Sequence, residues 1–288
     1  MSGPKGKGPA AAVTQEEVQR FCDFLYRRTG MSFAENKRYY IDRRLEDRIS
    51  ATGSESFQVY FSLLRSDTNH EIEYLINAFT VNETYFYRED HQLRCMTTDL
   101  LAGIAARKPP AEPIRIWSIP CSTGEEPYSI ALWLMENWPQ VDSHNVEIVG
   151  SDIDTRALKA ATDGIYGERA LMRLSRTLIE RYFKPVEANR YQIDEGLRGS
   201  IDFTRANLID ARDMARFRDF DIVFCRNVLI YFDDTSRRIA AEILYECMRP
   251  GGYICLGHSE TMSRISPLFR VCRFPDAIVY QRPEASDE

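Results

Sequence analysis

Two consecutive glutamates stand in residues 119–129 (IPCSTGEEPYS), a segment expected to connect a β-strand to an α-helix. Loops of this kind that cradle phosphates usually contain two or three glycines, whereas this one contains only Gly124. Glu125 and Glu126 would lie in the first helical turn and would repel a phosphate group. They suit a cation, such as the sulfonium and ammonium groups of S-adenosylmethionine. The alternative is that both glutamates only complement the helix dipole, and the loop alone leaves the two interpretations open.

Acidic residues also follow the next strand along the chain, in the segment VEIVGSDID at residues 146–154. A carboxylate that ends the second strand of an open α/β sheet can accept hydrogen bonds from both hydroxyls of a ribose. Asp152 is predicted in this role, because Asp154 is better placed to cap the helix that follows. The alternative is that both aspartates act only as helix caps.

The elements that must hold these residues alternate between strand and helix in the C-terminal part of the chain. Near-continuous apolar strands between helices indicate a buried, mostly parallel sheet, in which ligands bind beyond the carboxyl ends of the strands. Two short strands predicted after residue 184 suggest a small inserted β-structure. The main strands are predicted at 114–119, 146–154, 200–208, 220–232 and 253–260, with an antiparallel hairpin at 269–274 and 277–281; the main helices are predicted at 125–138, 155–162, 174–183 and 234–248.

The N-terminal part of the chain, residues 14–91, has the apolar spacing of helices and is predicted to form a small all-helical domain. Thr14 and Glu17 have the spacing of a capping box. Further helices are predicted at 35–50, 57–65 and 71–79. Residues 1–13 are expected to be a disordered tail, and residues 92–113, which contain three prolines, a linker.

The composition excludes several classes of protein. The net charge of −6 over 288 residues argues against an extended nucleic-acid surface, and no apolar run approaches the ~18 residues that span a bilayer. The seven cysteines and four histidines are scattered, which indicates reduced thiols in the cytoplasm and predicts no metal site. The expectation is a cytoplasmic monomer with no nucleic-acid partner and no insertion into a membrane.

Six segments of the sequence resemble the chemotaxis receptor methyltransferases, the CheR family. They occur in the family's order and at its spacing between residues 14 and 281, and TGEEPYS together with FCRNVLIYF is highly specific. The resemblance implies a helical N-terminal domain followed, at 114–284, by a Rossmann-like methyltransferase domain with an inserted β-subdomain at about 184–204. The six segments are TVNETYFYRE (80–89), PCSTGEEPYSIA (120–131), GSDID (150–154), FCRNVLIYF (224–232), RPGG (249–252) and GHSE (257–260).

The resemblance further implies an activity: methyl esterification of glutamate side chains on the cytoplasmic region of chemoreceptors. S-adenosylmethionine is the implied donor and S-adenosylhomocysteine the product. Arg88 and Tyr231 are implied to lie closest to the transferred methyl group, although Arg88 could instead form a structural ion pair with Glu89 or Asp90. The residues implied to bind the donor are Asn82, Thr84, Arg88, Asp152, Asn207, Leu208, Asn227, Val228 and one of the two loop glutamates, Glu126 in preference to Glu125.

Two features bear on how a receptor would bind. Family members that bind a receptor's C-terminal pentapeptide have a longer, glycine-bearing hairpin loop where this chain has residues 186–189, so methylation independent of that tether is expected.

On the helix predicted at 35–50, Lys37, Arg44 and Arg48 fall along one line and are predicted to dock the glutamate-rich receptor helices. The alternative is that these charges form only a solvated helix face.

Two other functions are compatible with parts of the sequence. A methyltransferase could act on a small molecule or on RNA, but the acidic charge and the absence of an NPPY-type motif count against nucleic acid. A non-enzymatic signalling module could bind the cofactor only, but the presence of both Arg88 and Tyr231 counts against it.

Overall fold

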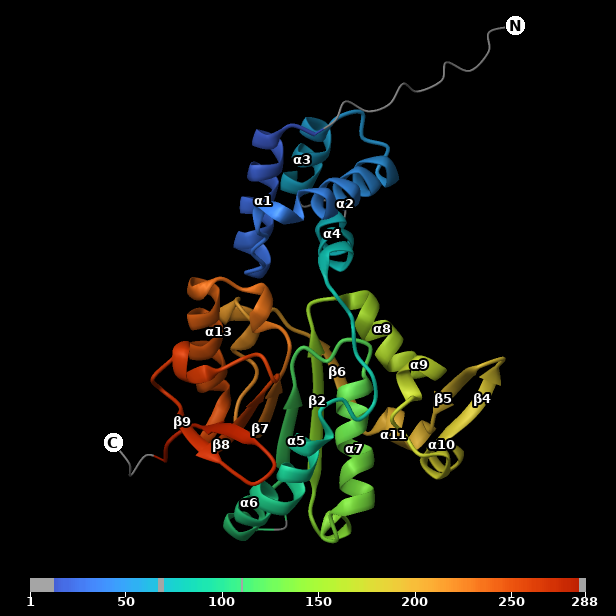
Figure 1. The fold of residues 1–288 in the computed structure, drawn as a ribbon, viewed down its shortest axis with the longest axis vertical. Coiled ribbons are helices and arrows are strands. Elements are labelled where there is room, and N and C mark those ends of the chain that lie inside the picture. The colour runs from blue at the N-terminus through green and yellow to red at the C-terminus, as the bar shows by residue number, and fades with distance from the viewer. Residues whose placement is uncertain (1–12, 67–69, 110, 285–288) are drawn as a thin grey trace, which may run out of the picture. The chain divides into compact units, whose positions relative to one another are not determined.

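The computed structural model describes residues 13–66, 70–109 and 111–284. This part of the chain forms two compact units, which divide between Thr80 and Val81 (Figure 1). The predicted disordered tail lies outside the described residues, except for Val13, which is buried. Among the described residues, no helix has the length and apolar character that crossing a membrane requires.

The first unit is all-helical, as the sequence predicted. The hydroxyl of Thr14 accepts from the N–H of Glu17, and the carboxylate of Glu17 accepts from the N–H of Thr14, which completes the predicted capping box. Buried aromatic and leucine side chains such as Phe21, Leu45 and Phe79 form its core. The helices are α1 (Gln15–Thr29), the short 3₁₀ turn η1 (Glu35–Lys37), α2 (Arg38–Ala51), α3 (Phe57–Ser66) and α4 (Glu71–Phe79).

The second unit is built on a seven-stranded sheet with the strand order β6-β2-β1-β7-β8-β10-β9. The first five strands in this order are parallel, and β10 and β9 form the predicted antiparallel hairpin at one edge. The strands are β1 (Ile114–Ser118), β2 (Val146–Asp152), β6 (Ile201–Arg205), β7 (Phe220–Cys225), β8 (Met248–Leu256), β9 (Arg270–Arg273) and β10 (Ile278–Gln281).

The side chains of successive residues in the central strands point to opposite faces of this sheet. Ile116 belongs to a large core cluster with residues of helix α7 (Glu125–Asn137), whereas the neighbouring Trp117 stacks on Phe217 and Phe220. Of the remaining long helices, α8 (Thr155–Asp163) follows β2, and α13 (Asp234–Cys247) follows β7 after a short connection. A mostly parallel sheet with connecting helices is the predicted α/β architecture.

The predicted linker at residues 92–113 is instead largely helical. It contains α5 (Asp90–Cys95), the π-helical turn η2 (Met96–Leu100) and α6 (Leu101–Arg107). Its apolar residues recur every three or four positions and are buried in the core of the second unit: Leu93, Met96, Leu100, Leu101 and Ile104. The prediction was wrong here because the prolines stand beyond the last helical turn and do not interrupt it.

The boundary of the helical domain also differs from the predicted position at residue 91. Residues 81–89, which we call the strap, belong to the second unit and contain no regular helix. Phe86 anchors the strap: its ring is fully buried against Tyr166 and Phe183, and its N–H donates to the carbonyl oxygen of Ala170 at 2.9 Å. A buried aromatic residue inside a polar segment therefore anchors the strap in the second unit.

A small three-stranded antiparallel sheet is inserted in the second unit, and the predicted residues 184–204 cover only part of it. Its strands are β3 (Ile165–Gly167), β4 (Phe183–Glu187) and β5 (Arg190–Ile193), in the order β3-β5-β4. Strands β4 and β5 lie at the predicted place, whereas β3 comes earlier in the chain. The segment after residue 200 is β6, the edge strand of the main sheet, where buried Ile201 pairs with Ile148. The predicted long strand at 220–232 likewise ends at Cys225, and a 3₁₀ turn, η4 (Leu229–Tyr231), follows it.

Candidate active site

The carboxyl ends of four parallel strands meet at one edge of the main sheet. Ser118 at the end of β1 lies beside Gly150 of β2 and Phe224 of β7, and Cys225 of β7 lies beside Leu256 of β8. The loops that follow these strands therefore start close together, as the sequence predicted. In open α/β sheets this edge is the usual ligand site.

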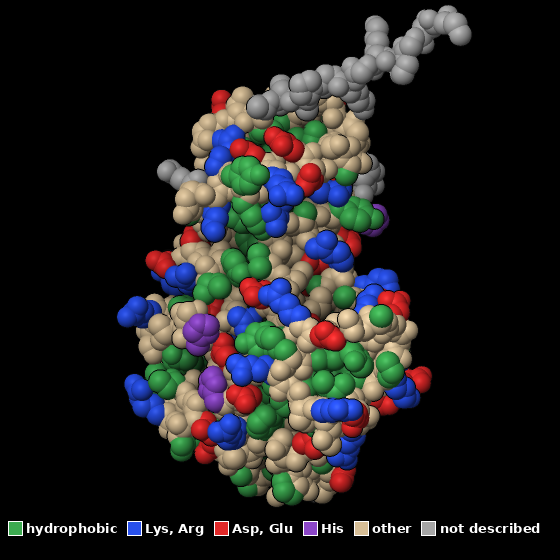
Figure 2. All heavy atoms as spheres, turned by 45° about the vertical axis from the view of Figure 1, so that its right-hand side comes forward, with side chains coloured by type: hydrophobic (Ala, Val, Ile, Leu, Met, Phe, Trp, Pro, Cys, Tyr) green, Lys and Arg blue, Asp and Glu red, His purple; other side chains and the backbone are tan. Residues whose placement is uncertain are grey.

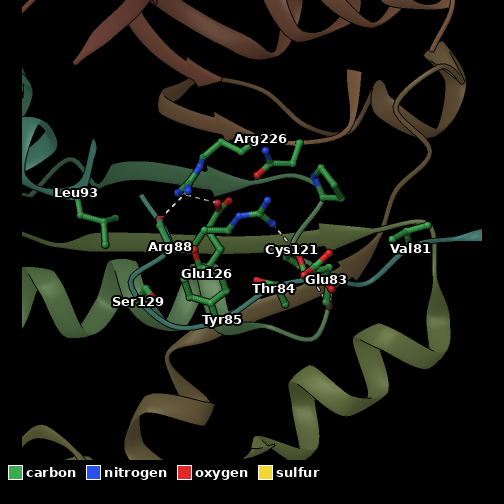
Figure 3. A pocket seen from close by; sticks show the side chains of 13 residues that line it. Val81, Glu83, Thr84, Tyr85, Arg88, Leu93, Cys121, Glu126, Ser129 and Arg226 are labelled. Carbon is green, nitrogen blue, oxygen red and sulfur yellow. Dashed lines mark hydrogen bonds and ion pairs between the residues drawn. The ribbon is translucent and has the colours of Figure 1, made fainter. Parts of the chain in front are cut away.

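A pocket opens at this edge and has a volume of about 540 Å³, its solvent-open mouth included (Figure 3). Residues of the strap line one part of it, and the loops after β1 and β7 line the rest. Four of the predicted site residues are in its lining: Thr84, Arg88, Glu126 and Asn227.

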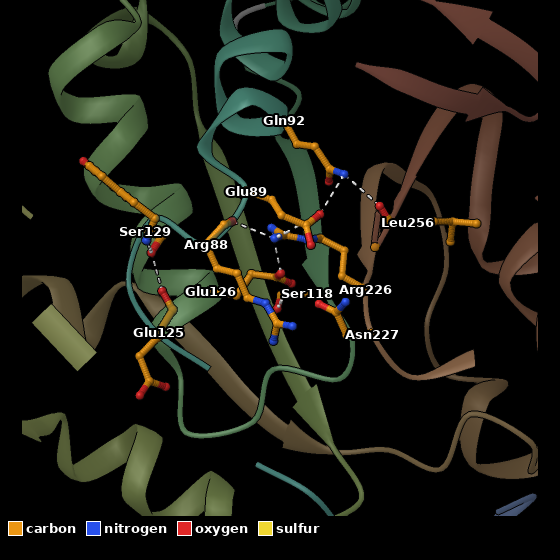
Figure 4. Close-up of polar contacts among 12 residues, drawn as sticks. Arg88, Glu89, Gln92, Ser118, Glu125, Glu126, Ser129, Arg226, Asn227 and Leu256 are labelled. Carbon is orange, nitrogen blue, oxygen red and sulfur yellow. Dashed lines mark hydrogen bonds and ion pairs between the residues drawn. The ribbon is translucent and has the colours of Figure 1, made fainter. Parts of the chain in front are cut away.

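Arg226, immediately after β7, connects the strap to the loop glutamate. One guanidinium nitrogen, Nη1, lies 3.1 Å from Oε2 of Glu126, and Nη2 donates to the carbonyl oxygen of Arg88 at 2.6 Å (Figure 4). The same guanidinium lies 3.6 Å from Glu89. Arg226 is buried, so these contacts supply the partners that a buried charge requires.

The two loop glutamates have different surroundings. Glu126 lines the pocket and accepts a hydrogen bond from the hydroxyl of Ser118 at 2.8 Å; burial raises the pKa of Glu126, and Arg226 opposes that effect. Glu125 points away from this network in Figure 4, and its carboxylate accepts from the hydroxyl of Thr123 at 2.6 Å. Burial raises the pKa of Glu125 as well.

Asp152 is buried at the end of β2 beside the glycine-poor loop. One carboxylate oxygen accepts from the N–H of Ser122 at 2.8 Å and the other from the N–H of Asp154 at 2.9 Å. Each oxygen keeps a further lone pair with which it can accept a ligand hydroxyl. Burial raises the pKa of Asp152 to about 6, despite these two hydrogen bonds.

Asp154 caps helix α8, as predicted, because its side chain accepts from the N–H of Ala157 at 2.9 Å. Its other carboxylate oxygen accepts from the side-chain amide of Asn82 at 2.7 Å. Asn82 also accepts from the hydroxyl of Ser122 at 3.2 Å. Through these two hydrogen bonds, Asn82 connects the start of the strap to the loop after β1, which contains Ser122, and to the loop after β2, which contains Asp154.

The alternative for Arg88 was a structural ion pair with Glu89 or Asp90, and neither pair is present among the described residues. Nη1 of Arg88 donates to the carbonyl oxygen of Glu83 at 2.7 Å, within the strap. Glu89 instead faces Arg226 and His258; burial alone would raise the pKa of Glu89, but these two groups hold it below its usual range.

Asn82, Glu125 and Asp152 lie outside the pocket lining, and so do the remaining predicted residues. Asn207 and Leu208 are buried after β6, and a hydrogen bond from the N–H of Ala206 to the carbonyl oxygen of Asp152 (3.0 Å) places their segment beside that residue. Val228 and Tyr231 belong to the loop and 3₁₀ turn after Asn227; Val228 is half-buried and Tyr231 exposed.

Comparison with known proteins identifies the family. The family description "CheR methyltransferase, SAM binding domain" matches residues 82–278, and "CheR methyltransferase, all-alpha domain" matches residues 16–80. The chain belongs to the CheR methyltransferase family. These two matched ranges meet where the two compact units divide.

Named relatives in this family cover nearly all of the chain. It is 45% identical over 279 residues to chemotaxis protein methyltransferase 2 of Vibrio cholerae, with 96% of each chain covered. It is 38% identical to chemotaxis protein methyltransferase 2 of Pseudomonas aeruginosa (89% of this chain, 90% of that protein) and 34% identical to the chemotaxis protein methyltransferase of Escherichia coli (90% and 88%). This CheR-family chain is thus an S-adenosylmethionine-dependent methyltransferase of chemotaxis.

The pocket residues fit this donor. Gly124 approaches helix α8 so closely that an added Cβ would lie 2.8 Å from the Cβ of Ala161. As the single glycine of its loop, it does not make a glycine-rich site for phosphate. Glu126 places a carboxylate in the lining for a cationic ligand, and Asp152, which lies outside the lining, accepts from the N–H of the lining residue Ser122. Among the described residues, Nε of buried Arg226 has no hydrogen-bond partner.

The predicted docking residues of this CheR-family member are not equivalent in the structure. Lys37 is exposed. The guanidinium of Arg48 forms a bidentate ion pair with the buried carboxylate of Glu71, with hydrogen bonds of 2.9 and 2.6 Å. The guanidinium of Arg44 lies 3.5 Å from the ring centre of Tyr40. Arg48 therefore serves the fold of the first unit, and the docking prediction now depends mainly on Lys37.

The sequence patterns assigned no role to two residues that contact the site: Arg226, which pairs with Glu126, and Glu260, whose carboxylate accepts from the N–H of Asn227 at 2.8 Å. Both stand in motifs that carried the CheR resemblance, FCRNVLIYF and GHSE. A usable signal existed for Arg226, because it directly follows the apolar run Ile222–Cys225, and a charge that is buried needs a partner. Glu260 gave no such signal, since its contacts depend on how β7 and β8 are placed side by side.

Proposed function

We propose that this chain methylates glutamate side chains on the cytoplasmic helices of chemoreceptors, forming methyl esters for sensory adaptation. The observation that carries the proposal is the position of Arg88. Arg88 lines the same pocket as Glu126 and Asn227. A cation that can attract an anionic methyl acceptor therefore lies beside the residues expected to bind the methyl donor. The names of the relatives support chemotaxis as the setting.

A glutamate acceptor needs no general base. Its side chain has a pKa near ~4.3 in water and is already ionised at neutral pH. When bound, S-adenosylmethionine supplies a methyl group activated by a sulfonium. The protein's task is to hold the carboxylate oxygen in line with that methyl group and to exclude water while the opposite charges combine.

We assign the roles of the residues accordingly. Arg88 orients the incoming carboxylate, and Tyr231 donates a hydrogen bond near the reacting atoms. Asp152 accepts the ribose hydroxyls, and Glu126, in preference to Glu125, faces the amino-acid part of the donor. The strap residues Asn82 and Thr84 cover the donor, and the segments Asn207–Leu208 and Asn227–Val228 line its other side.

The proposal also concerns the setting of the reaction. We infer a cytoplasmic monomer that acts without a receptor's C-terminal pentapeptide. The connection between β4 and β5 supports this last point, because it turns within two residues at Ala188 and Asn189. Asn189 adopts the left-handed backbone region there, with φ 58°, and no glycine takes part in the turn.

The test is methyl transfer from labelled S-adenosylmethionine to purified receptor cytoplasmic fragments, with and without their C-terminal pentapeptide. We expect equal initial rates for the two fragments and complete release of the label as methanol in mild base. Label that survives mild base would show N- or C-methylation and refute ester formation. A rate that depends on the pentapeptide would refute tether independence alone.

A further inference from the structure

Glu260 binds the backbone of the loop that carries both Asn227 and Tyr231. One of its carboxylate oxygens, Oε2, accepts from the N–H of Asn227 at 2.8 Å and from the N–H of Gly257 at 2.9 Å. The other, Oε1, accepts from the N–H of Ile230 at 3.3 Å. A single carboxylate thus accepts hydrogen bonds from three N–H groups, which belong to the segments that follow the neighbouring strands β7 and β8.

The loop needs such support because its backbone is unusual. Asn227 has φ 60°, in the left-handed region that non-glycine residues seldom adopt. A conformation of this kind costs about 1–3 kcal/mol and persists only where the surroundings impose it. The hydrogen bond from Asn227 to Glu260 is one such constraint.

Gly257 makes the arrangement possible. A Cβ at this position would lie 2.5 Å from Nδ2 of Asn227 and 2.8 Å from Oε2 of Glu260. The N–H of Glu260 in turn donates to the carbonyl oxygen of Gly257 at 2.9 Å, which closes a tight turn. The spacing of Gly257 and Glu260 in GHSE therefore brings the carboxylate against the β7 loop.

The loop leads directly to the predicted catalytic tyrosine. Ile230, whose N–H is bound by Glu260, precedes Tyr231, and the N–H of Tyr231 donates to the carbonyl oxygen of Val228 at 3.0 Å. A shift of this 3₁₀ turn would therefore move Tyr231 and Asn227 together. Displacements of about 1 Å at a reacting group can cost about a hundredfold in rate.

We propose that Glu260 is a positioning residue for methyl transfer: it holds the Asn227–Tyr231 loop in the geometry that the reaction needs. The inference rests on the proposed function, because it assigns Tyr231 to the methyl-transfer step. Glu260 itself acts through the backbone of its neighbours.

The experiment compares Glu260→Ala, Glu260→Gln and Gly257→Ala with the wild-type protein. The control is Glu242→Gln, the same chemical change on the exposed side of α13. The number of competent sites is counted by calorimetric titration with S-adenosylhomocysteine, and kcat is measured on receptor fragments and expressed per competent site. Glu260→Ala loses the hydrogen bonds to the carboxylate, and Gly257→Ala places a Cβ 2.8 Å from Oε2 of Glu260 and displaces it. Each change predicts a fall in kcat of at least about tenfold.

Glu260→Gln should be intermediate. Its amide oxygen can replace Oε2 and keep the bonds to Asn227 and Gly257, whereas its NH₂ group would face the N–H of Ile230 and cannot accept from it. Wild-type kcat per competent site in both Glu260→Gln and Gly257→Ala would overturn the proposal, even if Glu260→Ala failed to fold. If the wild-type protein itself methylated no receptor fragment, the proposed function would fail instead.

Discussion

The guanidinium of Arg226 and the carboxylate of Glu126 form an ion pair at 3.1 Å at the carboxyl edge of the sheet. Both side chains are largely withdrawn from solvent and both line the pocket. Through its second nitrogen, Arg226 also holds the carbonyl oxygen of Arg88. The pair therefore fixes the position of the strap, which carries Arg88, relative to the loop that carries Glu126.

Replacing Arg226 with methionine should destabilise the second unit by about 3–5 kcal/mol, because Glu126 and Glu89 would be left as poorly compensated buried charges. Chemical denaturation followed by tryptophan fluorescence measures this loss, since all three tryptophans lie in the second unit. The control is Arg176→Met, which removes an exposed ion pair with Glu180 and should leave the stability nearly unchanged.

The double variant Arg226→Met with Glu126→Gln tests the pair itself. Removing the second charge should restore part of the lost stability, because no unpaired Glu126 carboxylate then remains. Strictly additive losses from the two single substitutions would show that the ion pair is not the source of the effect.

Arg88→Ala should lower kcat by about a hundredfold, since it removes the cation proposed to orient the acceptor carboxylate. Binding of S-adenosylhomocysteine should weaken by less than about tenfold, because other residues provide most of the donor contacts. Arg94→Ala, in an exposed ion pair on α5, serves as the matched control. Full activity in Arg88→Ala would remove this residue from the reaction.

Affinity for S-adenosylhomocysteine should fall as the pH is lowered through about 6, the pKa to which burial raises Asp152. Ribose hydroxyls donate to the carboxylate, so the ionised form binds and protonation below this pKa weakens binding by up to about tenfold per pH unit. Calorimetry from about pH 5 to about pH 8 measures the profile. Asp152→Asn should bind weakly with a flat profile, and a wild-type profile equally flat would contradict the ribose role.

Lys37→Glu should slow receptor methylation at low salt, and the difference from the wild type should shrink as salt screens the surface charge. Charges of both signs are interspersed on the face drawn in Figure 2, so a local rather than a broad field is expected. Arg48→Glu should instead destabilise the first unit, because it places a second acid beside Glu71. Arg27→Glu, an exposed change on α1, is the control; an equal effect from it would argue against docking at Lys37.

Local signals predicted much of this structure. The capping box of Thr14 and Glu17, the helix cap at Asp154 and the apolar strands around Trp117 each depend on residues close in the chain. The placement of Asp152 at the sheet edge followed from the strand order of parallel α/β folds. Neighbouring sequence was sufficient for these features.

The errors arose where distant contacts decide the structure. Prolines suggested a linker, yet Leu93 and Ile104 are buried because the second unit offers them a core. The segment at Ile201 was predicted as a strand, but its assignment also to the inserted β-structure was wrong, because pairing with Ile148 makes it an edge strand of the main sheet. The contacts of Glu260 depend on the register between β7 and β8, which no local pattern specifies.

The most direct test of glutamate methylation uses two versions of one receptor cytoplasmic fragment. The first carries its methyl-accepting glutamates, and in the second each of these is replaced by glutamine, which offers no anionic oxygen. Carboxyl methylation at the pocket of Arg88 predicts that labelled methyl groups from S-adenosylmethionine appear only on the first fragment. Equal labelling of the glutamine-substituted fragment would contradict it.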